Sequence, residues 1–304
     1  MDRRDFIKCV IAAGIGMTVP RGFSDIAASD LDTGIPDLVV AHGPSQKDIT
    51  HSAIQGLGGM GRFVSRGDIV VIKPNIGWDR KPEQAATTNP EVVAALVELC
   101  YDAGAKQVKI FDRSVDDPRR CYRQSGIEEA ARAVGAEVTF IDERKFKDVT
   151  IDGLALKEWS FYRDILEADK IINVPIAKHH GSARLSMAMK NWMGVIGGWR
   201  GRIHLSMDKC LVDFALVIKP TLTLLDAVRI LTDHGPQGGN LQDVRKLDTI
   251  VAGVNQVAVD AFGTTLFGLK PEDFGYLRLA RQHGMGVIDL KQLSIQHIQG
   301  KGSV

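Results

Sequence analysis

Three segments of this 304-residue chain combine lysine, asparagine, aspartate and histidine in a way that could bind an anion or transfer protons. Each follows an apolar run, so each stands where a strand would end. The segments are Lys73-Pro74-Asn75, Asp112-Arg113-Ser114 and Pro175-Ile176-Ala177-Lys178-His179-His180. Lysine ammonium groups pair with carboxylates and phosphates, and imidazole titrates near neutral pH, which suits acid–base catalysis. We therefore predict that Lys178, His179 and His180 act in catalysis. Lys73 and Asn75 are predicted to bind the substrate.

The two adjacent histidines are not expected to share one role. Successive side chains of an extended segment point to opposite sides. We therefore expect one of His179 and His180 to act at the site and the other to pack elsewhere. His204 follows the glycine-rich residues 197–201 and is the candidate metal ligand.

A helix is predicted across residues 183–196, because apolar side chains recur there at helical spacing. These side chains are Leu185, Ala188, Met189, Trp192, Met193 and Ile196. Lys190 and Asn191 lie off the apolar stripe and are predicted to bind substrate; the alternative is a helix that shows both to water. Gly194 inside a helix costs about 1 kcal/mol relative to alanine. Its presence therefore indicates a close approach of backbone or ligand.

Apolar segments of strand length alternate with helical stretches along most of the chain. The expected strands are residues 37–41, 68–72, 107–111, 137–141, 170–174 and 247–251, and the expected helices include 46–60, 126–134, 207–218, 257–267 and 272–283. A further helix is predicted to begin at Asn89-Pro90 and end at Gly104. This alternation predicts an α/β fold with a mainly parallel sheet flanked by helices. A division into two closely packed lobes stays open. Ligands of such sheets bind beyond the carboxyl ends of the strands, where the three polar segments stand.

Several motifs in this order resemble the domain-of-unknown-function family number 362. They are Lys73-Pro74-Asn75-Ile76-Gly77, Thr88-Asn89-Pro90, Lys178-His179, Lys190-Asn191-Trp192-Met193-Gly194, and Val251-Ala252-Gly253 followed by Val257-Ala258-Val259-Asp260-Ala261. The resemblance covers about residues 65–270. One departure is Asn255-Gln256, where members of the family commonly have Asp-Pro. The resemblance itself implies no activity.

A second resemblance concerns three residues only. His180, Lys190 and His204 are similar in order and spacing to a histidine, a cofactor-bearing lysine and a metal-binding histidine of the nickel-pincer lactate racemases. That resemblance implies a nickel or other metal cofactor, which Lys190 would anchor and whose metal His204 would approach. It also implies that one of the paired histidines transfers a proton at a carbon next to a carboxylate. The glycine and proline that surround the lysine in those racemases are absent around Lys190.

Composition limits the classes of partner and cofactor. The chain has 38 basic and 37 acidic side chains, and this balance gives no reason to expect a nucleic-acid partner. Beyond the N-terminal segment it has three cysteines, Cys100, Cys121 and Cys210, and none of them forms a C-x-x-C pair. A four-cysteine iron–sulfur cluster is therefore not expected from this chain. No later apolar run reaches the roughly 20 residues of a spanning helix, so no stable membrane span is expected.

The N-terminal segment has the pattern of an export signal. Arg3-Arg4-Asp5-Phe6-Ile7-Lys8 stands before an apolar run at residues 9–19, the arrangement of a twin-arginine signal. We predict a signal at residues 1–28 and an α/β domain at 29–304. The twin-arginine translocation machinery would be a partner, and the location would be periplasmic or otherwise extracytoplasmic. The alternative is an amphipathic helix that happens to begin with two arginines.

Two functional hypotheses follow from these patterns. In the first, an exported α/β protein binds a small anion at the ends of its strands, because buried lysines need an anionic partner. Its chemistry would be isomerisation or racemisation of a small organic acid by proton transfer. In the second, a non-catalytic protein of the periplasm uses the same site to hold a ligand or cofactor, for example as a redox accessory.

Overall fold

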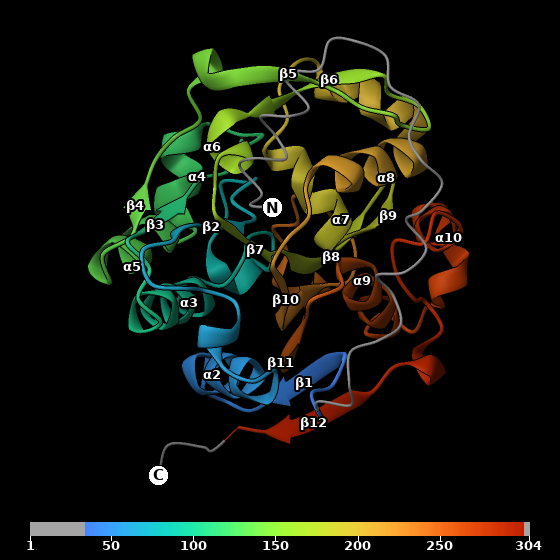
Figure 1. The fold of residues 1–304 in the computed structure, drawn as a ribbon. Helices are drawn as coiled ribbons and strands as arrows, with labels where there is room; N and C mark the ends of the chain where they lie inside the picture. Colours follow the sequence, from blue (N-terminus) through green and yellow to red (C-terminus); the bar gives the residue numbers. More distant parts are fainter. Residues whose placement is uncertain (1–33, 301–304) are drawn as a thin grey trace. The chain divides into compact units, whose positions relative to one another are not determined.

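The computed structural model of this chain describes residues 34–300, and the predicted export signal at residues 1–28 lies outside them. Its central element is a ten-stranded sheet (Figure 1). In spatial order the main path is β12 (Ile295–Gln299), β1 (Leu38–His42), β11 (Val244–Gly253), β10 (Leu222–Leu231), β7 (Lys170–Val174), β2 (Ile69–Pro74), β3 (Gln107–Ile110) and β4 (Glu137–Val138). Beside this path, β8 (Ile176–His180) pairs with β10, and β9 (Arg184–Ser186) pairs with β8.

The sheet is mainly parallel, which confirms the predicted α/β class. β10, β7, β2, β3 and β4 run parallel to one another, whereas β11 is antiparallel to both of its neighbours. The carboxyl ends of β2, β3 and β7 therefore meet at one edge of the sheet. Lys73 of β2 lies in register with Asn173 of β7, so their side chains leave the sheet on the same face.

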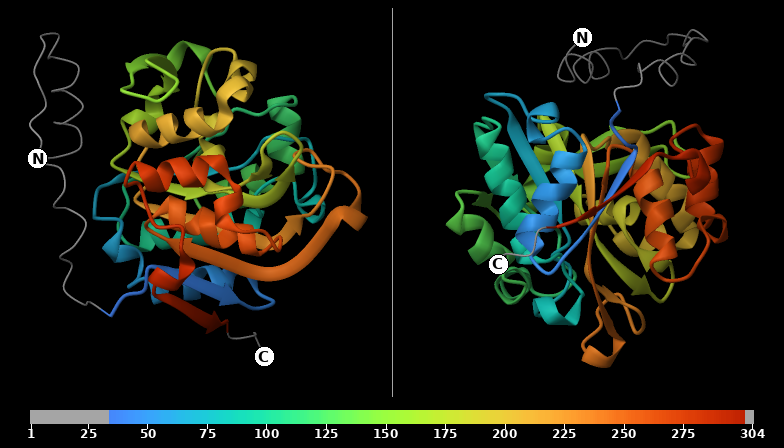
Figure 2. Two further views of the ribbon diagram at one scale, coloured as in Figure 1. Left: turned by 90° about the vertical axis from the view of Figure 1, so that its right-hand side faces the viewer. Right: turned by 90° about the horizontal axis from the view of Figure 1, so that it is seen from below.

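Apolar side chains alternate between the two faces of the sheet and form a core on each. In β2, for example, Val71 packs into one core, and Val70 and Ile72 pack into the other. Helices cover both faces, as the view from below shows (Figure 2). One face carries α2 (Gln46–Gly56), α3 (Pro90–Asp102), α4 (Pro118–Gln124) and α5 (Ile127–Ala133); the other carries α8 (Met207–Val217), α9 (Gln256–Thr265) and α10 (Gly275–Gln282).

Smaller elements complete the described part of the chain. They are the hairpin of β5 (Phe146–Thr150) and β6 (Glu158–Tyr162), the short helices α6 (Arg163–Leu166) and α7 (Ala188–Asn191), and several 3-10 turns, among them η4 (Trp192–Gly194) and η5 (Arg200–Ser206). The hairpin loop is fixed by Asp213 of α8, whose buried carboxylate accepts hydrogen bonds from three consecutive backbone N–H groups, the first on Leu154. Within residues 34–300, no helix is both long enough and apolar enough to cross a bilayer.

The predicted helix across residues 183–196 is wrong. The segment instead contains β9, the four-residue α7 and the turn η4. Arg184 has a positive φ of 63°, and Met187 is nearly extended at φ −147° and ψ −141°; neither conformation continues an α-helix. The apolar stripe is nevertheless buried except for Met193, which is partly buried, because the short elements pack on the core.

Candidate functional site

The carboxyl ends of β2, β3 and β7 open into a cavity of about 580 Å³, a volume common for small-ligand sites. Among residues 34–300, five lysine or arginine side chains and one carboxylate line it. The cations are Lys73, Arg113, Lys178, Lys190 and Arg200, and the carboxylate is Asp112. This excess of positive charge favours an anionic ligand.

Lys73 and Asp112 form a buried ion pair at the base of the cavity. Lys73 Nζ lies 2.9 Å from Asp112 Oδ1, and both side chains are almost fully buried. The second carboxylate oxygen accepts the backbone N–H of Ile76 at 2.6 Å. Burial lowers the pKa of Lys73, although the adjacent Asp112 acts in the opposite direction. The pair is thus internally neutralised, and Lys73 is held in place by its partners.

Asn191 joins α7 to the strand ends. Its Nδ2 group donates to the backbone oxygen of Lys73 at 3.0 Å and to Asn173 Oδ1 at 2.8 Å. Its Oδ1 accepts from Lys73 Nζ at 2.8 Å and from Asn75 Nδ2 at 3.2 Å. Asn173 in turn donates to the backbone oxygen of Ala188 at 2.9 Å. Asn173 is absent from the sequence predictions, although it is the one polar residue inside the apolar part of β7.

Asp260 of α9 sets the position of α7 from the other side. Its carboxylate accepts hydrogen bonds from the backbone N–H groups of Ala188 at 2.6 Å and Met189 at 3.0 Å. These are the first N–H groups of the helix, which have no partner within the helix itself. Burial raises the pKa of Asp260 to about 7, although the two backbone hydrogen bonds oppose the shift. The residue stands in the Val257–Ala261 motif, but the sequence does not reveal what it contacts.

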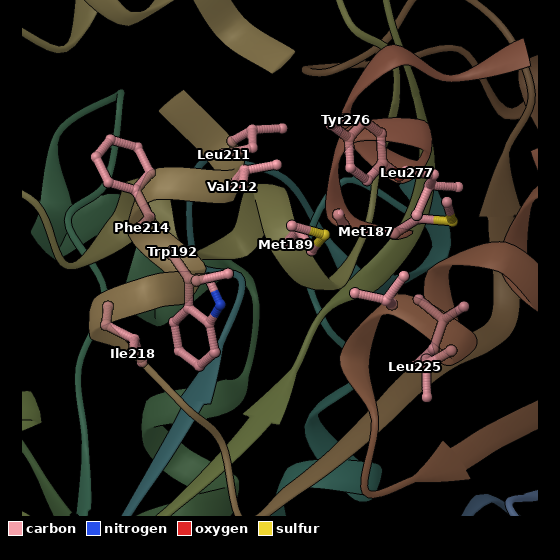
Figure 3. Close-up of a cluster of buried hydrophobic side chains, with 14 of the residues drawn as sticks. Met187, Met189, Trp192, Leu211, Val212, Phe214, Ile218, Leu225, Tyr276 and Leu277 are labelled. Carbon is pink, nitrogen blue, oxygen red and sulfur yellow. The ribbon is translucent and has the colours of Figure 1, made fainter. Parts of the chain in front are cut away.

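The apolar side of α7 and η4 is anchored in the core. Figure 3 shows Trp192 close to Phe214 and Ile218, and Met187 near Leu277. Trp192 is fully buried, and its indole N–H donates to Gln256 Oε1 at 2.8 Å. This packing leaves Lys190 and Asn191 to line the cavity.

Gly194 allows the backbone of η4 to approach the ion pair. A Cβ atom at this position would overlap Asp112 Oδ1 and approach Lys73 Nζ to 2.5 Å. The Gly194 carbonyl also accepts the N–H of Arg113 at 2.8 Å. The close approach that the sequence predicts at Gly194 is therefore present, and what approaches is the backbone of its own chain.

The strand β8 divides its polar residues between two cavities. Lys178 and His180 line the cavity of about 580 Å³, whereas His179 lines a separate one of about 310 Å³ together with Arg184 and Arg245. His179 Nδ1 accepts the backbone N–H of Gly235 at 3.0 Å. The two sides follow from the alternation of side chains along a strand, since these residues belong to β8 and not to a loop. The catalytic role predicted for His179 stays a prediction, and the residue stands outside the main cavity.

Lys178 and His180 are both buried, and burial lowers the pKa of each. Lys178 Nζ donates to Asn75 Oδ1 at 3.0 Å and to the backbone oxygen of Ala86 at 2.6 Å. Burial, with a smaller effect of Lys190, lowers the pKa of Lys178 to about 7. Burial and the nearby lysines lower the pKa of His180 to about 3. His180 is therefore neutral at physiological pH.

The hydrogen bonds of His180 identify its tautomer. Its Nδ1 atom accepts the backbone N–H groups of Ser182 and Ala183, each at 3.2 Å. A neutral imidazole has one donor and one acceptor nitrogen. The proton therefore lies on Nε2, which makes His180 a hydrogen-bond donor through that atom.

Lys190 lines the cavity beside Arg200. Its Nζ lies 3.3 Å from Met193 Sδ, and burial together with the charge of Arg200 lowers its pKa to about 8. Arg200 is held by backbone carbonyls, with distances of 2.7 Å to the oxygen of Arg113 and 2.9 Å to that of Ser114. The cavity thus contains two lysines, Lys178 and Lys190, whose pKa values lie close to neutrality.

Comparisons with known proteins identify the family. The profile of a domain of unknown function, DUF362, matches residues 70–265. The chain belongs to this family. The match confirms the resemblance that the sequence predicts for about residues 65–270.

Among individual proteins, this DUF362 chain is 28% identical over 226 residues to a thylakoid-associated protein of Synechocystis sp., covering 72% of this chain and 68% of that protein. A lactate racemase apoprotein from Thermoanaerobacterium thermosaccharolyticum superposes with a TM-score of 0.45 at 12% identity, over 74% of this chain and 56% of that one. A protein from Thermotoga maritima gives a TM-score of 0.45 at 11% identity, over 75% and 60%. The DUF362 chain thus spans less than two thirds of each of these two structures.

His204 of the DUF362 chain lies in η5 and lines the same cavity as His180 and Lys190. The His180 and His204 rings stack with centroids 6.0 Å apart, and Ser182 Oγ lies 3.3 Å and 3.2 Å from their Nδ1 atoms. Within residues 34–300, no three His, Cys, Asp or Glu side chains are arranged to hold a metal ion. Metal binding by His204 stays a prediction.

Proposed function

We propose that this protein binds a small organic acid in the basic cavity and moves a proton on the bound molecule. The observation that carries the proposal is the charge of the cavity. Among residues 34–300, five lysine or arginine side chains line it with one carboxylate, which is already paired with Lys73, and Arg113 pairs with Glu143 outside the lining. An anion would neutralise the remaining positive charge, which is costly to bury without a partner.

The acid–base part of the proposal rests on Lys178 and Lys190. A group exchanges protons most effectively when its pKa lies near the working pH, and the pKa values of these lysines are about 7 and about 8. His180 would contribute a hydrogen bond from Nε2 and not a proton, because it stays neutral. Either lysine can therefore be the base that removes a proton from the bound acid.

Calorimetric titration of the protein with pyruvate, lactate and phosphate near neutral pH tests the binding. We expect at least one of these anions to bind and Lys190→Gln to weaken its affinity by about tenfold, equivalent to about 1.4 kcal/mol. Lys219→Gln is the matched control, because Lys219 is exposed and lies outside the cavity. Failure of all three anions to bind, or equal weakening by both variants, would contradict an anion site here.

The catalytic half of the proposal has a separate readout. In deuterated water, NMR should show deuterium entering a carbon-bound position of the bound acid in the presence of the parent protein, and much more slowly with Lys178→Gln. Binding without any exchange would instead support the non-catalytic ligand-binding protein.

A second candidate, a metal-bearing cofactor on Lys190, is favoured by one observation. Lys190, His180 and His204, the three residues named by the racemase resemblance, line one cavity. The Lys190 amine has no carboxylate partner among residues 34–300 that would prevent its attachment to a cofactor. Lys190 and His204 would hold such a group, which would supply a Lewis-acid centre. Intact-mass and metal measurements on protein purified from its own source test this, and an unmodified, metal-free chain would exclude it.

We further propose export through the twin-arginine pathway, on the basis of Arg3-Arg4-Asp5-Phe6-Ile7-Lys8 and the apolar run that follows. The expected result is that the full chain appears in the extracytoplasmic fraction and that a double substitution of Arg3 and Arg4 by lysine retains it in the cytoplasm. Arg21→Lys serves as the control, because it preserves the pair. Unchanged export of the double variant would exclude this route.

A further inference from the structure

Lys190 differs from the other cations of the cavity in what its nitrogen contacts. Lys73 Nζ pairs with Asp112, and Lys178 Nζ donates to two oxygen acceptors at 3.0 Å and 2.6 Å. Arg200 donates to three backbone carbonyl oxygens. Each of these groups is oriented by oxygen atoms of its own chain.

The Lys190 amine has no such oxygen acceptor within residues 34–300. Its partner is Met193 Sδ at 3.3 Å, and a thioether is a weak acceptor. A largely buried amine with so weak a hydrogen-bond partner destabilises the folded protein unless a ligand supplies an acceptor. The backbone just before Lys190 is nevertheless held by two buried side chains, Asp260 at the N–H groups of Ala188 and Met189 and Asn173 at the carbonyl of Ala188. The amine is thus presented to the cavity from a fixed backbone.

We propose that Lys190 is a nucleophile that forms an imine with the carbonyl carbon of a small 2-oxo acid. This inference rests on the proposed anion-binding function, because the cationic side chains of the cavity would hold the carboxylate. Only a neutral amine attacks a carbonyl carbon. Burial and Arg200 lower the Lys190 pKa to about 8, so about a tenth of the amine is neutral near pH 7.

The chemistry needs a proton but no oxidant or reductant. The nitrogen lone pair of Lys190 forms the new C–N bond while the C=O π bond breaks toward oxygen, and one proton of that nitrogen moves to the oxygen, which gives a neutral carbinolamine. The ammonium form of Lys178, whose pKa is about 7, then gives a proton to the hydroxyl group. The C–O bond breaks, water leaves, and the nitrogen lone pair completes the C=N bond. Addition of water reverses the sequence. The iminium ion acidifies the hydrogens on the carbon beyond the former carbonyl, which connects this step to proton transfer.

Borohydride trapping tests the proposal. The full-length protein is incubated with pyruvate or with glyoxylate, the smallest 2-oxo acid, reduced with sodium borohydride, digested and mapped by mass spectrometry. We expect one reduced adduct on the peptide that contains Lys190, at least about tenfold above the exposed Lys219 of the same digest, because the neutral amine fraction rises tenfold for each unit that the pKa falls.

Two variants and a binding measurement separate the possible results. Lys190→Arg keeps the charge but cannot form an imine, so it should abolish the adduct; Lys190→Gln should do the same if arginine disturbs the fold. Labelling at Lys178, or labelling no stronger than at Lys219, overturns the assignment of Lys190. If pyruvate binds calorimetrically but neither acid labels Lys190, the imine is wrong and the anion site stands. If neither acid binds, and lactate and phosphate also fail to bind, the proposed function fails as well.

Discussion

The two lysines Lys73 and Lys190 line one cavity in opposite electrostatic surroundings. Lys73 is fully buried and pairs with Asp112 at 2.9 Å while also donating to Asn191 Oδ1 at 2.8 Å. Lys190 is less deeply buried and has a sulfur atom at 3.3 Å as its partner. The same residue type is thus hydrogen-bonded to oxygen acceptors in one place and, within residues 34–300, lacks any oxygen acceptor in the other. The difference shows that the groups around a lysine, and not the residue type alone, determine what that lysine can do.

The largest expected effect comes from removing each charge in turn. Lys73→Met leaves the buried carboxylate of Asp112 without its cation, and breaking a buried ion pair in this way costs about 3–5 kcal/mol. Lys190→Met removes an amine that has no carboxylate partner among residues 34–300, and it should change the free energy of unfolding by less than about 1 kcal/mol, or increase it. Denaturant unfolding of both variants measures the two values. Equal losses would show that Lys190 also has a structural partner.

The second effect concerns the backbone of η4 at Gly194, which lies against the ion pair of Lys73 and Asp112. Gly194→Ala would place a Cβ atom on Asp112 Oδ1, so either the ion pair or η4 must move, at a cost of about 2–4 kcal/mol by analogy with overpacked or broken buried groups. Gly61→Ala is the matched control, since nothing lies within 4 Å of its added Cβ. Thermal and denaturant unfolding should separate the two substitutions. A stable Gly194→Ala protein would mean that the ion pair adapts more easily than its burial suggests.

A third prediction concerns Asp260, which holds the start of α7, the helix that carries Lys190. Asp260→Ala removes the acceptor of two backbone N–H groups and should lower stability by about 1–3 kcal/mol, with less borohydride labelling of Lys190. Asp117→Ala is the control, because Asp117 also caps a helix but at an exposed position on α4. It should cost about 1 kcal/mol and leave the labelling unchanged. Unchanged labelling in Asp260→Ala would remove Asp260 from the positioning of Lys190.

Much of the sheet could be predicted because its strands are locally recognisable. The predicted strand at residues 170–174 coincides with β7, and the start of α3 at Pro90 follows from Asn89, whose side chain accepts the N–H of Glu91. Such signals depend only on neighbours in the sequence. The strand ends that carry Lys73 and Asn75 could be recognised for the same reason.

The region around α7 could not be predicted, because distant residues determine it. The start of α7 is fixed by Asp260, which lies 72 residues further along the chain, and no local pattern records that contact. The strand character of Lys178, His179 and His180 depends on pairing with both β9 and β10. The apolar spacing indicated most of the buried side chains correctly. It could not show that the segment forms β9, α7 and η4 instead of one helix, because both arrangements can bury the same side chains.

The last expected effect, and the most specific to the comparison of Lys73 with Lys190, is the pH dependence of the free energy of unfolding that Lys190 causes. Its pKa is about 8 in the folded protein and about 10.5 in an unfolded chain. Between these values the unfolded chain binds a proton that the folded protein does not, so stability rises with pH across this window. Below about pH 8, Lys190 is protonated in both the folded and the unfolded chain, and the full cost of burying its charge lowers the stability. Above about pH 10.5, Lys190 is neutral in both, and this cost is absent.

Lys190→Met lacks this titration, so its advantage over the parent should be largest below about pH 8 and shrink by about 1–3 kcal/mol as the pH approaches 10.5. Lys178 remains in both proteins, and its pKa rises when the charge of Lys190 is removed. A higher Lys178 pKa makes the free energy of unfolding of the variant rise less steeply with pH. It therefore also makes the advantage of the variant over the parent shrink as the pH rises. Unfolding free energies of both proteins at several pH values across this window test the prediction. Parallel curves would mean that the Lys190 amine has the surroundings of an ordinary surface lysine, and with that the contrast with Lys73 would lose its electrostatic basis.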